Sequence, residues 1–372
     1  MKTFFNLIQE VQKPGLCYRC GGCAAFCTAI NYGALKIDAN GKPVYDDIEK
    51  CVECGICYSI CPEINDLDEE TKRKAAWSEP MGRVIETTVA RAADIKVREK
   101  ATDGGSVTAL LLHLFDRNRI DGAIVTRPVG RFRRKPFLAT TRDEIAESAG
   151  LFFDAFQGTE DFNDEYMTYS SIREFDTMIK KGLKRVALVG TPCQIKSLRK
   201  MQVLNLIPSD CIRICFGLFC SGNFIFGAQE QKKLAAMADI CWKDVSRINM
   251  KDRLIITLNS GEKKSISLED MESMKRYACH YCSDYSAEFA DISFGGIGAM
   301  EKWTTVITRT PLGRAVLADA RSSGSIEQFR VEDDPEFAST ALQEVRKASA
   351  LKKKKARYRR RNLVTKSIRI RM

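Results

Sequence analysis

The 372-residue sequence lacks several features that would each assign it to a common class of protein. No apolar run approaches the roughly 18 residues of a membrane-spanning helix, and the best candidate, TALLLHLF at 108–115, is far too short. The amino terminus has no apolar segment long enough for a secretory signal, so we expect a cytoplasmic location. The G-x-G-x-x-G and Walker A motifs are absent, which argues against the usual nucleotide-binding folds.

Cysteine, in contrast, is abundant, with 15 residues. A disulfide framework is typical of short secreted chains. Here the thiols gather in metal-type clusters within a long chain that has no export signal. We therefore interpret most of them as metal ligands.

The net charge of +11 comes from the carboxyl-terminal tail. Residues 352–372 hold 11 of the 59 basic residues and no acid, which leaves 48 basic and 48 acidic residues elsewhere. A run of like charges predicts a solvated, disordered tail, although contact with an acidic partner subunit or peripheral association with a membrane stays open. We expect no nucleic-acid binding, because Tyr358 is the only aromatic residue among these charges.

Two segments, at 17–27 and 51–61, share the spacing Cys-x2-Cys-x2-Cys-x3-Cys. This is the fingerprint of bacterial two-cluster ferredoxins, in which the fourth Cys of each run ligates the other cluster. A pair of zinc sites does not require this spacing twice. We predict two [4Fe-4S] clusters, one held by Cys17, Cys20, Cys23 and Cys61 and the other by Cys51, Cys54, Cys57 and Cys27.

The sequence beyond about residue 83 alternates apolar strand patterns with amphipathic helical patterns. A helical pattern separates KRVALVG from CIRICFGLF, which favours parallel strands, and RLIITLNSGEKKSISL predicts an antiparallel hairpin. TTRDEIAESAG opens with a capping box. We predict an α/β protein with a two-cluster ferredoxin-like unit at 12–66, a connector at 67–82, an α/β domain with a mostly parallel mixed sheet at 83–332, and a helix and basic tail at 333–372.

A third Cys-x-x-Cys pair, Cys279 and Cys282, needs two further thiols to bind a cluster. Cys193 and Cys220 each follow an apolar strand, at the sheet edge where α/β folds bind ligands. Our hypothesis is a third [4Fe-4S] cluster on these four residues. A zinc site with the same ligands, a redox dithiol, and ordinary core cysteines are the alternatives.

We expect the remaining cysteines, Cys211, Cys215 and Cys241, to pack as small apolar residues. His280, between the third pair, is interpreted as a surface-facing or hydrogen-bonded imidazole, and His113 as a core residue. RFRRKP at 131–136 could attract an acidic ligand, but a solvated basic loop is the preferred interpretation.

Two glycine loops are candidates for cofactor binding. TDGGSVTALL at 102–111 leads into a helix, and the unpaired amides of such an end suit a phosphate or the polar edge of a flavin. ISFGGIGAMEKWTT at 292–305 follows the third cysteine pair. Neither loop is sufficient by itself to identify the ligand.

Four segments occur in a characteristic order: DGGSVTALLLHLFD, VALVGTPCQIKSLRKM, FGLFCSGNF and CHYCSDYSAEFADISFGGIGAMEKWTTVITRT. From Cys17 to about Thr310, the chain resembles the beta subunits of coenzyme F420-reducing hydrogenase and F420-dependent formate dehydrogenase. The input subunit of the reduced-F420 dehydrogenase and the first half of F420-dependent sulfite reductase belong to the same group.

This resemblance implies an FAD-binding α/β domain, a cluster beside the flavin, and a site for F420 over the isoalloxazine. It supports the four ligands of the third cluster. FGLFCSGNF lacks the acidic residue that many members place after GLFC, and AGLFFDAFQ replaces a Ser-Lys-Tyr type segment, so the F420 pocket stays unassigned. The residues implied around the flavin are Gly104, Gly105, Ser106, Thr108, Thr191, Gln194, Asn223, Gly295, Gly296 and Gly298.

The implied function is hydride transfer between F420 and FAD, followed by single-electron relay through three [4Fe-4S] clusters. The flavin performs the chemistry, so no catalytic side chain is assigned. The expected partner is a redox subunit of hydrogenase, formate dehydrogenase, F420 dehydrogenase or heterodisulfide/sulfite reductase type. The alternative is a ferredoxin-dependent FAD and iron-sulfur reductase that resembles those of the chlorophyll pathway, which the fused ferredoxin unit and basic tail disfavour.

Overall fold

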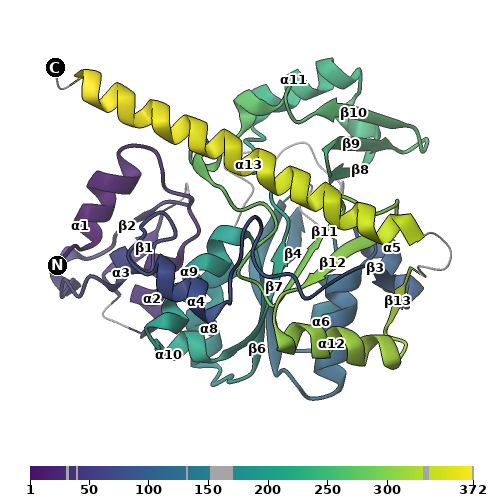
Figure 1. Ribbon diagram of the computed structural model, residues 1–372, viewed down its shortest axis with the longest axis horizontal. Helices are drawn as coiled ribbons and strands as arrows, with labels where there is room; N and C mark the ends of the chain where they lie inside the picture. The colour runs from purple at the N-terminus through teal and green to yellow at the C-terminus, as the bar shows by residue number, and fades with distance from the viewer. Residues whose placement is uncertain (31–32, 39–40, 131–132, 151–170, 330–334, 371–372) are drawn as a thin grey trace.

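The computed structural model describes all residues except 31–32, 39–40, 131–132, 151–170, 330–334 and 371–372. An amino-terminal unit, a large sheet with helices on both faces and a smaller sheet lie around the long helix α13 (Pro335–Ile370), which crosses the front of the molecule (Figure 1). The segment AGLFFDAFQ (149–157), which departs from the family pattern, lies mostly outside the described residues.

The amino-terminal unit contains short helices and one two-stranded hairpin. Its core includes Phe4, Leu7 and Val11, which precede the predicted start of the unit at residue 12. Cys27 and Cys57 belong to the same core, so two of the predicted cluster ligands pack among the apolar side chains of this unit. Its elements are α1 (Phe4–Leu7), the π-helix η1 (Ile8–Gln12), α2 (Gly22–Ile30), β1 (Leu35–Ile37), β2 (Pro43–Tyr45), η2 (Ile48–Lys50), α3 (Ile56–Ser59) and α4 (Asp68–Lys74).

The large sheet has eight strands in the order β13-β3-β12-β11-β7-β6-β4-β5. The four adjacent strands β11, β7, β6 and β4 are parallel, which confirms the predicted pairing of β6 with β7. Only three of the seven pairs are parallel, so the prediction of a mostly parallel sheet holds for the centre alone. The strands are β3 (Glu86–Ala92), β4 (Gly122–Gly130), β5 (Arg133–Ala139), β6 (Val186–Gly190), β7 (Ile212–Leu218), β11 (Ile292–Gly295), β12 (Thr304–Thr308) and β13 (Ile326–Gln328).

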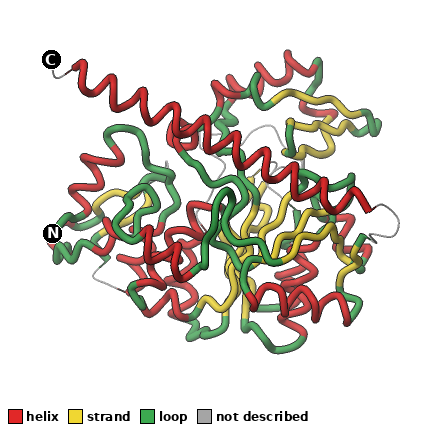
Figure 2. The backbone as a smooth tube through the Cα atoms, viewed as in Figure 1, coloured by secondary structure: helices red, strands yellow, loops and turns green. Residues whose placement is uncertain are grey.

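Helices cover both faces of this sheet (Figure 2). Leu110 of α6, Ile145 of α7 and Leu317 of α12 belong to the core on one face, whereas Met178 of α8 and Leu198 of α9 belong to the core on the other. The predicted capping box begins α7 and is confirmed. The helices of this part are α5 (Ile95–Lys100), α6 (Ser106–Asp116), α7 (Arg142–Glu147), η3 (Ser171–Glu174), α8 (Phe175–Lys180), α9 (Pro192–Val203), α10 (Ile207–Asp210) and α12 (Pro311–Ser322).

A second, three-stranded antiparallel sheet has its own core. Leu234, Ile248, Leu254 and Ile256 are buried there. The pairing of β9 with β10 confirms the predicted hairpin. The elements are α11 (Ala228–Ala238), η4 (Trp242–Asp244), β8 (Val245–Met250), β9 (Arg253–Leu258), β10 (Lys263–Ser267), η5 (Glu272–Met274) and η6 (Tyr277–Tyr281).

The basic tail, as far as Ile370, forms the second half of α13, so the prediction of a disordered tail is wrong, and the prediction of a solvated one holds for only part of its side chains. Lys353 is only 8% exposed and Ala356 only 1% exposed. Several positive charges of the tail form ion pairs with carboxylates from distant parts of the chain, as in the 3.0 Å ion pair between Lys353 and Glu288. Among the described residues, no helix combines the length and apolarity needed to span a bilayer.

Candidate cofactor sites

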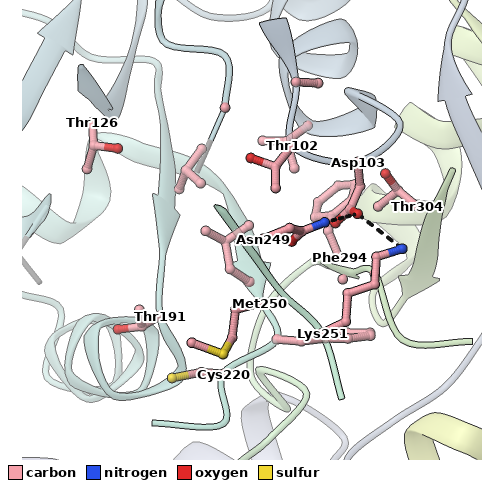
Figure 3. A pocket seen from close by; sticks show the side chains of 18 of the residues that line it. Thr102, Asp103, Thr126, Thr191, Cys220, Asn249, Met250, Lys251, Phe294 and Thr304 are labelled. Carbon is pink, nitrogen blue, oxygen red and sulfur yellow. Dashed lines mark hydrogen bonds and ion pairs between the residues drawn. The ribbon is translucent and has the colours of Figure 1, made fainter. Parts of the chain in front are cut away.

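A large cavity opens at the carboxyl edge of the parallel strands, where ligands of α/β sheets bind. Thr191 follows β6, Leu218 and Cys220 lie at the end of β7, and Gly295 ends β11; all four line the cavity. Figure 3 shows side chains from these strands and from the small sheet around one opening. Of the residues predicted around a flavin, the lining includes Gly105, Ser106, Thr108, Thr191, Gln194, Asn223, Gly295 and Gly296.

The first turn of α6 forms one wall of this cavity. Gly105 has φ +75°, a left-handed conformation that glycine adopts without strain, and it precedes the helix. The first amides of an α-helix have no partner within the helix, and they carry the positive end of its dipole. The Ser106 hydroxyl donates to the Ala90 carbonyl at 2.9 Å, so it is the backbone of this turn that suits a polar ligand.

Gly104 and Gly298 are not among the lining residues. A Cβ on Gly104 would lie 2.8 Å from the Ala90 carbonyl oxygen, and a Cβ on Gly298 would lie 2.7 Å from the backbone of Ala341 in α13. Both glycines therefore allow close packing of the chain on itself.

Three further polar residues of the cavity are Asp103, which lies in the predicted loop 102–111, and Asn249 and Lys251, which carried no signal in the sequence. Asn249 Nδ2 donates to Asp103 Oδ1 at 3.0 Å, and Lys251 Nζ lies 3.3 Å from the same oxygen (Figure 3). Asn249 and Lys251 belong to or follow β8, so the small sheet supplies one side of the cavity. No local motif marks them, because they meet Asp103 only in the folded chain.

Of the basic segment 131–136, residues 134–136 are not among the lining residues of this cavity. Arg134 is 1% exposed and donates to the carbonyls of Thr126 and Ser148 at 2.9 and 2.6 Å. For this residue the interpretation as a solvated loop is wrong, because its guanidinium satisfies backbone carbonyls in the interior.

A second, smaller cavity adjoins the first. Cys193, Cys220, Cys279 and Cys282 line it, as does Cys20 of the amino-terminal unit. The structure thus brings together the four residues predicted from strand ends and the isolated pair. The two cavities share the lining residues Thr191, Gln194, Cys220, Gly222 and Asn223.

The four thiols lie in an environment that disfavours free thiolates. Burial raises the pKa of Cys193, and nearby Cys20, Cys282 and Cys220 raise it further. Burial likewise raises the pKa of Cys279. Such thiols ionise when a metal takes the place of the proton. This donor set is therefore suited to an iron-sulfur cluster.

Polar groups surround these sulfurs. The Asn223 amide donates to Cys279 Sγ at 3.4 Å, and Thr191 Oγ1 lies 3.4 Å from Cys193 Sγ. Lys352 of α13 also lines the cavity, although we had assigned it to a solvated tail. Burial lowers the pKa of Lys352, but the nearby cysteines, led by Cys282, and the Asp284 carboxylate together outweigh burial and raise it.

Four cysteines of the amino-terminal unit interact as one group. Burial raises the pKa of Cys23, and Cys20, Cys17 and Cys61 raise it further. Burial also raises the pKa of Cys20 to about 12, although its hydrogen bond with Ser197 of α9 opposes the shift. These four are the predicted ligands of one ferredoxin cluster, and Cys20 connects them to the second cavity.

The other four cysteines form a group of their own. Burial raises the pKa of Cys57 to about 12, and Cys54, Cys27 and Cys51 surround it. All four line a third small cavity. Cys57 also acts electrostatically on Cys23, so the two groups are neighbours. Among the described residues, no group of three or more His, Cys, Asp or Glu side chains is arranged to hold a single metal ion.

The remaining cysteines and histidines have the predicted roles with one exception. Cys215 is fully buried and Cys211 packs against the same core, whereas Cys241 is exposed beyond the end of α11, so its prediction is wrong. His113 is buried, with its Nε2 3.0 Å from Asp319. His280 Nδ1 lies 2.8 Å from an Arg359 nitrogen, which confirms a hydrogen-bonded imidazole.

The fold and the grouped cysteines define an electron-transfer protein with an amino-terminal [4Fe-4S] ferredoxin-like domain and a mixed α/β domain. The chain belongs to the coenzyme F420 hydrogenase/dehydrogenase beta subunit family. Residues 87–159 match the family's amino-terminal model and residues 183–334 its carboxyl-terminal model. Residues 9–62 match a 4Fe-4S dicluster domain. Membership in this family implies electron transfer within a complex.

Several relatives extend over most of the chain. The coenzyme F420 hydrogenase subunit beta of Methanococcus voltae is 29% identical, over 74% of this chain and 94% of its own. The coenzyme F420-dependent sulfite reductase of Methanocaldococcus jannaschii is 28% identical, over 83% of this chain and 46% of its own. A chain in the solved F420-reducing [NiFe] hydrogenase complex of Methanosarcina barkeri superimposes with TM-score 0.65 and 24% identity, over 76% of this chain and 93% of that one, which shows the fold alone.

Proposed function

We propose that the protein is an F420-dependent oxidoreductase subunit that transfers a hydride between F420 and FAD and relays single electrons through three [4Fe-4S] clusters to or from a partner redox subunit. One observation carries the proposal: the large cavity, the cysteine cavity and the two ferredoxin cysteine groups adjoin one another in a continuous series. A series of this kind suits stepwise electron transfer.

The lining of the large cavity supports the proposal of a bound flavin. Leu111, Val125 and Phe294 offer apolar surface for an aromatic ring system. The first turn of α6 offers backbone amides for the phosphates or the polar ring edge, and Asn249 and Lys251 offer further donors. These residues, with Thr191 and Gln194 at the junction of the two cavities, would hold FAD.

Three cysteine groups would hold the clusters. Cys193, Cys220, Cys279 and Cys282 would bind the one next to FAD, and the eight ferredoxin cysteines would bind the other two as predicted from their spacing. When bound, FAD exchanges electrons in pairs or singly, whereas each cluster carries one electron at a time. The chain itself supplies binding, orientation and shielding from water.

A partner subunit is expected because relatives are named as subunits of F420 hydrogenase and F420-dependent formate dehydrogenase. The partner would hold the catalytic centre for a substrate other than F420, and it would exchange electrons with the ferredoxin-like domain.

An anaerobic titration of the reconstituted chain with reduced F420 tests the proposal. The wild type should contain FAD and about twelve irons, and both the flavin and the cluster absorbance should bleach. Cys193→Ala should lower the iron content to about eight and slow cluster reduction while flavin bleaching persists. Exposed Cys241→Ala is the matched control and should change neither iron nor rate.

Full cofactor content without bleaching would exclude F420 as the donor, and a ferredoxin-dependent reductase of another unsaturated substrate would then be the better description. Absence of FAD from the reconstituted chain would refute the flavin relay itself.

A further inference from the structure

Lys352 reaches from α13 into the wall of the cysteine cavity. Its ammonium donates to the carbonyl oxygens of Cys220 at 2.6 Å and Asp284 at 2.8 Å. The same side chain lines the cavity together with Cys279 and Cys282. The amine therefore lies beside two proposed ligands and at the backbone of a third.

The charge on Lys352 has no carboxylate ion-pair partner within the part of the chain that the structure describes. Its neighbour on the helix, Lys353, pairs with Glu288 at 3.0 Å. Moving an ammonium out of water is costly unless an anion balances it. The anions that act on this ammonium are the Asp284 carboxylate and, more strongly, the sulfurs of Cys282, Cys220 and Cys279, once a metal ionises them.

Ion pairs of neighbouring residues on α13 hold the Lys352 side chain at the cavity wall and away from solvent. One residue on, Lys353 is anchored by Glu288, and two turns further on Arg360 forms an ion pair with Glu63 at 2.6 Å. These contacts join the helix to the body and to the ferredoxin-like domain. They fix the depth at which the ammonium lies.

We propose that Lys352 is a positioning residue that raises the reduction potential of the third cluster. This inference rests on the proposed cluster at Cys193, Cys220, Cys279 and Cys282. An oxidised [4Fe-4S] cluster with four thiolates carries about −2, and reduction adds one electron and one negative charge. A fixed cation stabilises the more negative state more strongly, and the partly buried site screens it less than water would.

The test is a redox titration of the reconstituted full chain, followed by electron paramagnetic resonance. The signal of the third cluster is identified by its loss in Cys193→Ala. In Lys352→Gln, the ratio of reduced to oxidised third cluster at fixed potential should fall at least tenfold, which corresponds to about 59 mV for one electron. Lys352→Arg keeps the charge and should restore most of the shift.

Lys354→Gln is the matched control, because it removes the same charge from an exposed position on the same helix. It should leave the midpoint of the third cluster unchanged. Loss of about four irons in Lys352→Gln, with retention in Lys352→Arg, would also support the proposal.

Equal midpoints in Lys352→Gln and Lys354→Gln, at full iron content, would overturn the role of Lys352 and leave the proposed function intact. Equal iron loss in Lys352→Gln and Lys352→Arg would overturn it too, because packing rather than charge would then be responsible. A wild type with only about eight irons would refute the third cluster, and this inference with it.

Discussion

Replacement of Arg360 by Met should loosen α13 from the ferredoxin-like domain. Its two Nη atoms lie 2.6 and 2.7 Å from the two Glu63 carboxylate oxygens, and its Nε donates to the Tyr281 carbonyl at 3.2 Å. Methionine keeps much of the apolar stem and removes every donor. Glu63 would then be left without this partner.

The magnitude follows from the exposure of the two side chains. Glu63 is 6% exposed, whereas Arg360 is 43% exposed. Breaking a fully buried pair costs about 3–5 kcal/mol, and an exposed pair contributes about 0–1 kcal/mol. A value of about 2 kcal/mol is therefore expected here. Since 1.4 kcal/mol is a factor of ten, local opening of α13 should become about 30-fold more populated.

Amide hydrogen exchange measured by mass spectrometry on the holoprotein is the assay, because it reports local opening. Peptides that cover residues 351–363 should exchange about 30-fold faster. The control is Arg357→Met on the same helix, since Arg357 is 69% exposed and lies 4.0 Å from Glu79. Its exchange should change less than about twofold. Equal exchange rates in the two variants would refute the assignment of this contact as an anchor.

Two further predictions concern the cavity and pH. Gly105→Ala should lower flavin retention on gel filtration, because a Cβ in this left-handed conformation would lie 3.2 Å from Ala101 and Val97 side chains. Gly182→Ala, also left-handed but in open space, should retain flavin like the wild type; equal retention in both variants would contradict the argument. Burial, with Asp284 adding to it, raises the pKa of Glu288 from 4.5 to about 7. Lys353 lowers this pKa and offsets the shift only in part. The contribution of Glu288 to the free energy of unfolding is therefore fully present below pH 4.5 and is lost as the pH rises through about 7. Glu288→Gln should reduce this fall in the denaturation midpoint between pH 5 and 8, and an unchanged pH profile would show that another group is responsible.

Local patterns predicted much of the fold. The alternation of RLIITLNSGEKKSISL requires only neighbouring residues, and it predicted the β9–β10 hairpin correctly. The capping box at Thr141 and Glu144 likewise depends on a side chain and an amide three residues apart. Parallel pairing of β6 and β7 followed from one intervening helical pattern. The mixed sheet was predicted, but the antiparallel pairing of its outer strands was not, because strand order depends on long connections.

The site was predictable where spacing or strand ends mark it. Cys193 and Cys220 could be associated with the distant pair because the ends of parallel strands meet at one edge. Gly298, which the family resemblance implied near the flavin, is not among the lining residues and lies against Ala341 of α13. No local pattern indicates a contact with a helix from the chain's end. Asn249 and Lys251 were not predicted either, because the small sheet brings them to the cavity only in the folded chain.

The sequence by itself determined the ferredoxin-like domain, because ligand spacing over a few residues decides which cysteines can enclose a cluster. It also determined the central parallel strands through their apolar patterns. Only the tertiary structure decided the place of the basic tail. Eleven positive charges in 21 residues predict a solvated segment, yet Glu63, Glu272 and Glu288 lie where the helix passes. Opposite charges stabilise one another only where they lie close in space, and the fold determines that distance.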